Sequence, residues 1–150
     1  MTVSKSFNWS SAYGKLLIDS GCHRWKFRVN EKHSYQDSLS FGITKENECQ
    51  KKLNNFSICY GWIGTNPSAT SNGYHNDDYG SKIKLINGKS ETVEMIFDAD
   101  EPSLRYIIND KDYGVIPLRV PIDPKVKYRM AVCFYCAPQN IDLLDYQQIR

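Results

Sequence analysis

The chain has 150 residues, 41% of them hydrophobic and 13% aromatic, which is enough apolar material for the core of one folded domain. Nineteen basic and seventeen acidic residues leave a formal net charge of +2, too small and too evenly spread for a nucleic-acid-binding surface. No apolar run reaches the length of a signal peptide or the roughly 18 residues of a membrane span, so we expect a cytoplasmic domain without a membrane partner. We expect one monomeric domain over residues 1–150, with no nucleic acid as a partner.

Apolar and polar residues alternate with a period of two along much of the chain, which is the pattern of strands that bury one face. In residues 23–30 (HRWKFRVN), Trp25, Phe27 and Val29 point to one face and the basic side chains between them point to the other. In chain order, strands are expected at residues 15–18, 23–30, 38–44, 56–62, 81–86, 92–98, 103–108, 127–135 and 140–145. Segments rich in Gly, Asn, Asp and Ser separate them, and only residues 43–56 favour a helical turn. The sequence therefore predicts an all-β, antiparallel β-sandwich.

The segment FDADEPS (97–103) has the composition of a tight turn between two of these strands. Its carboxylates can accept hydrogen bonds from nearby backbone N–H groups, and Pro102 prevents the first strand from continuing. A calcium loop built on Asp98 and Asp100 is the alternative, but it lacks further oxygen ligands at regular spacing. Residues 109–114 (NDKDYG) are likewise interpreted as a turn.

Five cysteines at irregular spacing favour reduced thiols in a chain without an export signal; they are Cys22, Cys49, Cys59, Cys133 and Cys136. The C-x-x-C of residues 133–136 falls on an expected strand, and a zinc site would need two more ligands beside it. Cys22 and His23 are the candidates for that second pair. We expect no bound zinc, no other metal and no disulfide.

His75 lies close to two acidic residues, Asp77 and Asp78, a combination that could serve acid/base catalysis. No nucleophile elbow, glycine-rich phosphate loop or metal motif accompanies them. The sequence therefore does not predict an enzyme.

An aromatic-rich stretch, YGWIGTNPSATSNGYHNDDYG (60–80), fits no simple period over its whole length. Tyr60 and Trp62 fall on an alternating segment and are expected in the core, where large rings bury the most area. Tyr74, His75 and Tyr79 fall in what is interpreted as a long polar loop, where an exposed ring needs something to pack on it. Each of the two tyrosines could alternatively fold back onto the sheet edge.

Several of these segments resemble, in the same order, the motifs of SPRY domains. SGCHRWKFRV (20–29) resembles the family's "SG.HYWEVRV" strand, and SFGIT (40–44) resembles its "GVA/GIA" strand. YGWIG and YHND resemble its "SWG" and "YH.G" segments, residues 93–115 resemble its "LD.D.GTLSF..NG..LGVAF" hairpin, and residues 128–144 resemble its last strands. The resemblance covers about residues 14–145. Arg24, Lys26 and the run INGKSETV depart from the pattern, which makes this a divergent sequence whose partner is not carried over.

The resemblance implies a non-enzymatic protein-interaction module without a cofactor, such as a substrate-recognition or scaffold domain of a larger protein. In SPRY adaptors of the SOCS-box type, the tyrosine that matches Tyr74 lies in a shallow peptide pocket. The matching rim positions are Thr44 and Lys45 together with Tyr135, and His75 and Asn76 adjoin Tyr74. Strand alternation gives separate support for Tyr135, which should face outward if Phe134 faces the core.

A lectin-like glycan-binding module is the alternative, because a β-sandwich with loop Tyr, Asn and Asp residues can stack a sugar ring and bond its hydroxyl groups. Tyr74, Asn76, Asp77 and Asp78 are the residues that would serve it. The missing export signal and the lack of a recognisable calcium site count against this alternative.

Overall fold

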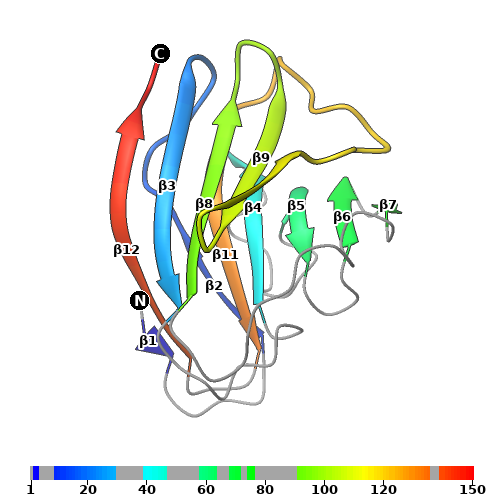
Figure 1. Ribbon diagram of the computed structural model, residues 1–150. Coiled ribbons are helices and arrows are strands. Elements are labelled where there is room, and N and C mark those ends of the chain that lie inside the picture. Colours follow the sequence, from blue (N-terminus) through cyan, green and yellow to red (C-terminus); the bar gives the residue numbers. More distant parts are fainter. Residues whose placement is uncertain are drawn as a thin grey trace.

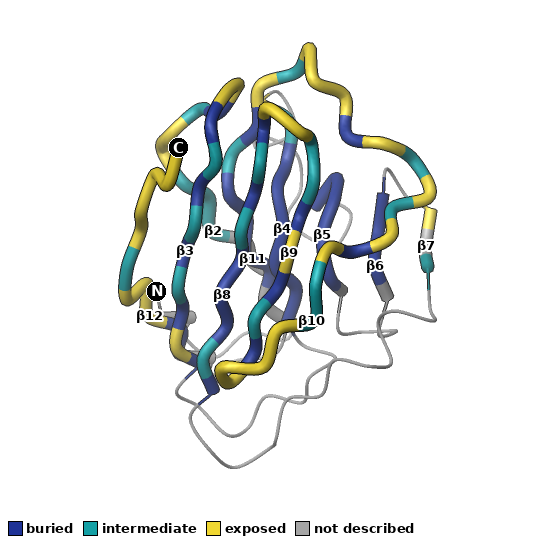
Figure 2. The backbone as a smooth tube through the Cα atoms, turned by 45° about the horizontal axis from the view of Figure 1, so that its top comes forward, coloured by how far each residue is buried: buried dark blue, intermediate teal, exposed yellow. Residues whose placement is uncertain are grey.

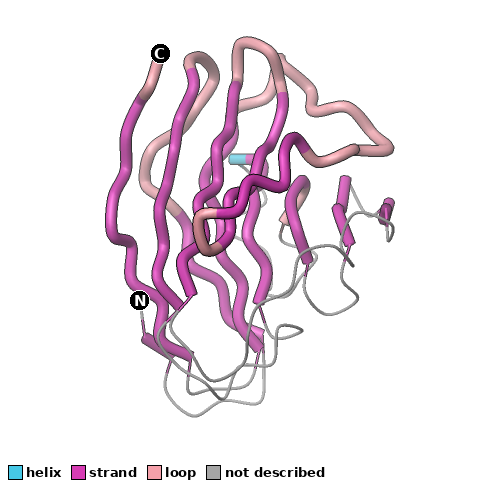
Figure 3. The backbone as a smooth tube through the Cα atoms, viewed as in Figure 1, coloured by secondary structure: helices cyan, strands magenta, loops and turns pink. Residues whose placement is uncertain are grey.

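The computed structural model of the chain describes residues 2–3, 9–29, 39–46, 58–63, 68–71, 74–76, 91–135 and 139–150. Most of these residues form strands, with no α-helix among them and one residue, Glu46, in a 3₁₀ conformation (Figure 3). The strands pack as two antiparallel sheets, one in front of the other in Figure 1. The expected all-β sandwich is confirmed. No helix in the described part of the chain is long and apolar enough to cross a membrane.

The first sheet contains six of the described strands and runs in the order β1-β12-β3-β8-β9-β10. Their bounds are β1 (Thr2–Val3), β12 (Gln139–Gln148), β3 (Cys22–Val29), β8 (Glu91–Asp98), β9 (Ser103–Ile108) and β10 (Lys111–Val115). Strands β3, β8 and β9 form its centre, and the apolar residues of the alternating pattern are the buried ones.

The second sheet runs in the order β2-β11-β4-β5-β6-β7. Its strands are β2 (Trp9–Tyr13), β11 (Tyr128–Tyr135), β4 (Leu39–Lys45), β5 (Tyr60–Ile63), β6 (Ser68–Ser71) and β7 (Tyr74–Asn76). Among the described strands, β7 lies at one edge of this sheet and β2 lies at the other.

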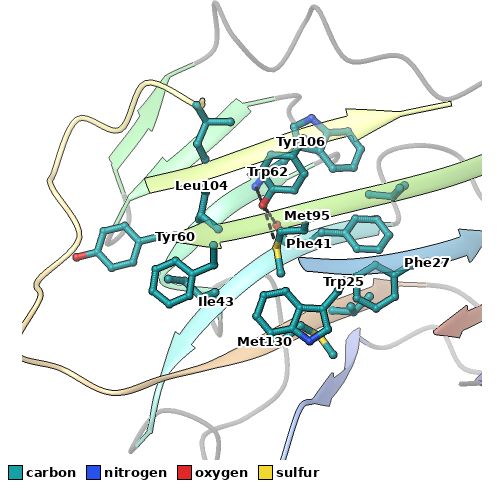
Figure 4. Close-up of a cluster of buried hydrophobic side chains, with 14 of the residues drawn as sticks. Trp25, Phe27, Phe41, Ile43, Tyr60, Trp62, Met95, Leu104, Tyr106 and Met130 are labelled. Atoms are coloured by element: carbon teal, nitrogen blue, oxygen red, sulfur yellow. Dashed lines mark hydrogen bonds between the residues drawn. The ribbon is translucent and has the colours of Figure 1, made fainter. Parts of the chain in front are cut away.

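Aromatic side chains from both sheets fill the space between them (Figure 4). The rings of Phe27 and Phe41, one from each sheet, lie 5.4 Å apart between centroids. The Tyr106 hydroxyl on β9 donates a hydrogen bond to the Phe41 carbonyl at 2.6 Å and accepts one from the Trp62 backbone N–H at 3.3 Å. Trp25 is buried, which confirms the expected core face of its strand.

Strands β4 and β5 approach each other at two glycines that face each other in the register, Gly42 and Gly61. A Cβ atom added to Gly42 would lie 2.1 Å from the Tyr60 carbonyl oxygen, closer than any real contact allows. A Cβ atom on Gly61 would lie 2.3 Å from the Phe41 carbonyl oxygen. The close pairing of these strands therefore requires glycine on both sides.

The hairpin between β8 and β9 confirms the turn predicted at residues 97–103. One carboxylate oxygen of Asp98 accepts hydrogen bonds from the backbone N–H groups of Asp100 and Glu101, both at 3.0 Å. Asp100 in turn accepts a bond at 2.9 Å from the backbone N–H of Gly21, and Arg150 forms an ion pair with Asp98. The acidic side chains of this turn hold backbone and a neighbouring cation in place.

Several predicted elements differ from the structure, among them the long polar loop expected after residue 62, which contains strands β6 and β7. Residues 15–18 do not form a strand; the edge strand is β2 instead, and of residues 15–18 only Ile18 makes a strand-like bridge, to Tyr128. The turn predicted at residues 109–114 is limited to Asn109 and Asp110, both with positive φ, because the residues after them pair with β9. The strand predicted at residues 81–86 and most of the helical turn predicted at 43–56 lie outside the described residues.

Strand β11 departs from the expected pattern of one buried and one solvent-exposed face. Tyr128, Met130 and Val132 face the core, as alternation along residues 127–135 predicts, but Ala131 and Cys133 on the other face are also buried. Ile58 packs with these two residues in a second small cluster on the other side of the sheet, and Tyr13 packs against it. Both faces of this strand are therefore covered.

Candidate partner-binding site

A segment without strand structure, residues 116–127, connects β10 in the first sheet to β11 in the second, and we call it the strap. Figure 2 shows it passing beside β7 and over one end of the sandwich, with mostly exposed residues. Ile116 and Ile122 are buried, and Leu118 and Val126 pack against the core. Three prolines in this segment restrict its backbone and make it a stiff connection; they are Pro117, Pro121 and Pro124.

Side chains from three neighbouring strands hold the backbone of the strap. The bonds run from Tyr60 Oη to the Pro121 carbonyl (3.2 Å), from the Val120 N–H to Ser71 Oγ (3.0 Å), and from Asn76 Nδ2 to the Pro117 carbonyl (3.3 Å). The predicted site residue Asn76 therefore has a positioning contact. A partner that used the same amide would have to share it with the strap.

Tyr128 fixes the far part of the strap, because its hydroxyl donates a hydrogen bond to the Asp123 carbonyl at 3.0 Å. Burial, reinforced by the nearby Tyr60, raises the pKa of Tyr128 well above its usual value. The phenol therefore stays protonated and keeps donating at any physiological pH.

Tyr74 lies on the edge strand β7 and faces the same side of the sheet as the strap. It is the outermost member of a register row that begins in the core with Ile43 and continues through Tyr60 and Ser71. The first three members of this row are buried, whereas 59% of Tyr74 is exposed. The residue that was predicted to contact a partner is thus accessible, although it lies on a short strand and not in a long loop.

At the other end of the strap, a groove of about 430 Å³ is lined by Glu46, Lys125, Val126 and Lys127. The backbone N–H of Glu46 donates to the Lys127 carbonyl at 3.1 Å, which joins the end of β4 to the strap. Lys45, one of the predicted rim residues, precedes Glu46 in the chain and is half-buried. We call the surface formed by Tyr74, Asn76, the strap, Lys45 and Glu46 the strap end.

The prediction that Thr44 lies on an exposed rim is wrong. Thr44 is 0% exposed, and its hydroxyl lies 3.7 Å from the Cys59 sulfur in a hydrogen-bonding arrangement. Residues 58 and 59 precede β5, and their burial alongside β4 closes the face on which Thr44 was expected to meet solvent.

Tyr135 does not share a site with Tyr74 or Lys45. Lys45 pairs with Tyr128 at the start of β11, whereas Tyr135 ends the same strand and pairs with Trp9. Seven residues separate the two ends, about 23 Å at roughly 3.3 Å per residue. The side chains of Tyr135 and His75 lie outside what the structure describes, so the predicted outward orientation of Tyr135 remains a prediction.

A second hollow, of about 180 Å³, lies at the opposite edge of the sandwich. It is lined by Gly14, Lys15, Leu16, Trp25, Met130, Leu143 and Tyr146. Tyr146 closes one side of it, donating or accepting a 2.8 Å hydrogen bond with His23 Nδ1, while His23 Nε2 donates to the Ser20 carbonyl at 2.8 Å. This hollow is mostly apolar and lacks the group of cations found at the strap end.

Sequence reasoning missed the strap. Its residues were not placed in any element. Their position in space relative to Tyr74 depends on the pairing of strands that are far apart in the sequence. The alternation of apolar residues at 116, 118, 120 and 122 was the available signal that this segment packs against the core.

No protein-family model matches the sequence. No curated protein matches it either. The structure is similar to the SPRY domain of human HERC1, with a TM-score of 0.68 and 13% sequence identity over 99% of this chain and 89% of that one. It is also similar to the TRIM65 PSpry domain, with a TM-score of 0.59 and 12% identity over 90% of this chain and 70% of that one. A sialidase matches with a TM-score of 0.52 and 16% identity over 89% of this chain but only 11% of its own.

These similarities cover nearly the whole chain, and the two highest TM-scores among them belong to SPRY domains. The chain therefore has the SPRY fold, as the sequence motifs indicated.

Proposed function

We propose that this chain is a non-enzymatic protein-interaction module that binds a short segment of a partner protein at the strap end. The SPRY fold supports an interaction module. The observation that carries the choice of surface is Tyr74, a large ring that is 59% exposed beside a rigid, proline-rich segment. Aromatic rings on a fixed scaffold are the usual anchors of protein interfaces.

The strap end also meets the energetic requirement for binding without a large ordering cost. The hydrogen bonds from Tyr60, Ser71 and Asn76 hold the strap against the sheet before any partner arrives. A surface that is already ordered loses little conformational entropy on binding, so more of the contact energy appears as affinity. The module would serve as a substrate-recognition or scaffold domain within a larger protein.

Selection of peptides from a random display library on the wild-type chain tests this proposal. Calorimetric titration of a selected peptide is then repeated with Tyr74→Ala and with Tyr146→Ala, a matched tyrosine at the opposite hollow. We expect Tyr74→Ala to weaken binding about 30-fold or more, the loss typical of a truncated anchor, and Tyr146→Ala to leave it unchanged.

The proposal fails if Tyr74→Ala binds like the wild type while Tyr146→Ala loses binding, because the partner surface would then be the apolar hollow. A glycan array run in parallel covers the lectin-like alternative. Binding to sugars together with no peptide binding would replace the proposed function with that one.

A further inference from the structure

Some cations of the described surface form ion pairs with carboxylates, and others, such as Lys26, Arg28 and Lys111 on the first sheet, form none within the described ranges. Three arginines of the first sheet have carboxylate partners: Arg24 contacts Glu94 and Asp145, Arg105 contacts Asp112, and Arg150 contacts Asp98 and Asp100. The strap carries Arg119, Lys125 and Lys127, all exposed, and within the described ranges none of them forms an ion pair. The positive charges of these three strap residues are thus not neutralised by described carboxylates.

Two carboxylates do lie on this surface, Glu46 and Asp123. Asp123 accepts a hydrogen bond from the Lys125 backbone N–H at 2.9 Å, which shapes the turn before the groove. The strap itself, residues 116–127, carries three cations against one carboxylate, Asp123, and Glu46 lies beside it at the groove. The excess is concentrated on one rigid surface, where it can act on a bound ligand.

We propose that the partner segment is an acidic peptide, with an apolar or aromatic residue against Tyr74 and at least one carboxylate in the groove beside Lys125 and Lys127. This inference rests on the proposed function, because it assumes that the strap end is the binding surface. Charge complementarity between the groove and the segment gives both orientation and a faster encounter. Val126 supplies an apolar floor between the two lysines.

The register sets the spacing between the two contacts. Three strand separations lie between β7 and β4, about 14 Å at roughly 4.8 Å each. Glu46 lies three residues beyond Ile43, the β4 member of the Tyr74 row, which adds roughly 10 Å along the strand. The direct span is therefore about 17 Å, and an extended peptide needs about five residues to cover it.

The test uses peptides selected on the wild-type chain from a random display library. We expect Asp and Glu to be enriched about four to six positions from an apolar residue. In titrations, the double variant Lys125→Gln/Lys127→Gln should bind these peptides about five- to tenfold more weakly, as expected for two exposed ion pairs, and its affinity should depend less on salt. The control is Lys26→Gln/Lys111→Gln, which removes two lysines of the first sheet and should bind like the wild type.

Two kinds of failure are distinguishable. If the selected peptides require Tyr74 but show no acidic enrichment, and the Lys125→Gln/Lys127→Gln variant binds like the wild type, the acidic-partner inference is overturned and the proposed function stands. If no peptide binds, or the selected peptides do not respond to Tyr74→Ala, the proposed function and this inference are both overturned.

Discussion

The aromatic-rich stretch of residues 60–76 divides into two regions with opposite surroundings. On β5, Tyr60 and Trp62 are 1% and 0% exposed, whereas on β7 Tyr74 is 59% exposed. All three face the same side of the same sheet. Strand β5 lies opposite the first sheet, and β7 lies at the edge, so position in the sheet and not residue type decides which ring is buried.

This difference separates two roles for the same kind of side chain. A ring in the centre contributes buried area and should matter for stability. A ring at the edge contributes little to stability and is available to a partner. A central ring whose removal leaves stability unchanged, or an edge ring whose removal unfolds the domain, would contradict this assignment.

The largest effect is expected for Trp62→Ala. Removing a fully buried indole should lower the free energy of unfolding by about 3–5 kcal/mol, and Trp25→Ala should fall in the same range. Chemical denaturation monitored by circular dichroism measures this loss. A variant that unfolds at the wild-type denaturant concentration would show that the ring does not belong to the core.

Gly42→Ala is expected to cost about 2–3 kcal/mol, because its new methyl group would force β4 away from the Tyr60 carbonyl. The matched control is Gly14→Ala, whose Cβ atom would meet Met130 Cβ at an ordinary 3.5 Å. Thermal unfolding of the two variants should differ clearly. Equal midpoints would mean that β4 and β5 are not in close contact at this position.

Tyr106→Phe should lower the free energy of unfolding by about 1–2 kcal/mol, since it leaves the Phe41 carbonyl and the Trp62 N–H without their buried hydroxyl partner. Tyr74→Phe is the control, because it removes a hydroxyl from a mostly exposed ring and should leave stability unchanged. Equal stability of the two variants would show that the Tyr106 hydroxyl does not stabilise these two backbone groups.

A smaller, pH-dependent effect is expected at the β9–β10 edge. The hydrogen bond from Arg105, aided by one from the Gly114 N–H, lowers the pKa of Asp112 from an ordinary 3.8 to about 2. The folded state therefore gains stability from this carboxylate above pH 3.8, and loses it as the pH falls toward 2. Asp112→Asn should be less stable than the wild type at neutral pH and equal to it near pH 2. A stability difference that persists unchanged in acid would show that the ionised Asp112 carboxylate is not its cause.

Much of the fold was predictable because local alternation and the buried face agree in β3, β8 and β9. The edge strands were not, because their patterns are weak. β2 (WSSAY) has small polar residues, and the more apolar residues 15–18 attracted the prediction, yet Leu16 is largely exposed. β10 was not predicted, because its residues are of types common in turns. Only Asn109 and Asp110 form the turn itself.

The candidate site was only partly predictable. The SPRY resemblance singled out Tyr74, but the sequence left open whether its ring is exposed or folded onto the sheet edge. Its distance from Tyr135 depends on strand register, which no local pattern reveals. The burial of Thr44 depends on residues 58 and 59 covering β4. The strap and its lysines come to the same end of the sandwich as Tyr74 only because the chain crosses there from one sheet to the other.

We infer that Tyr74 serves binding, whereas the buried rings beside it serve the fold. Measuring both properties of Tyr74→Ala, by chemical denaturation and by calorimetric titration of a selected peptide, tests it most directly. We predict a free energy of unfolding within about 0.5 kcal/mol of the wild type and a binding free energy weaker by about 2 kcal/mol or more. A destabilised variant that still binds like the wild type would contradict the claim.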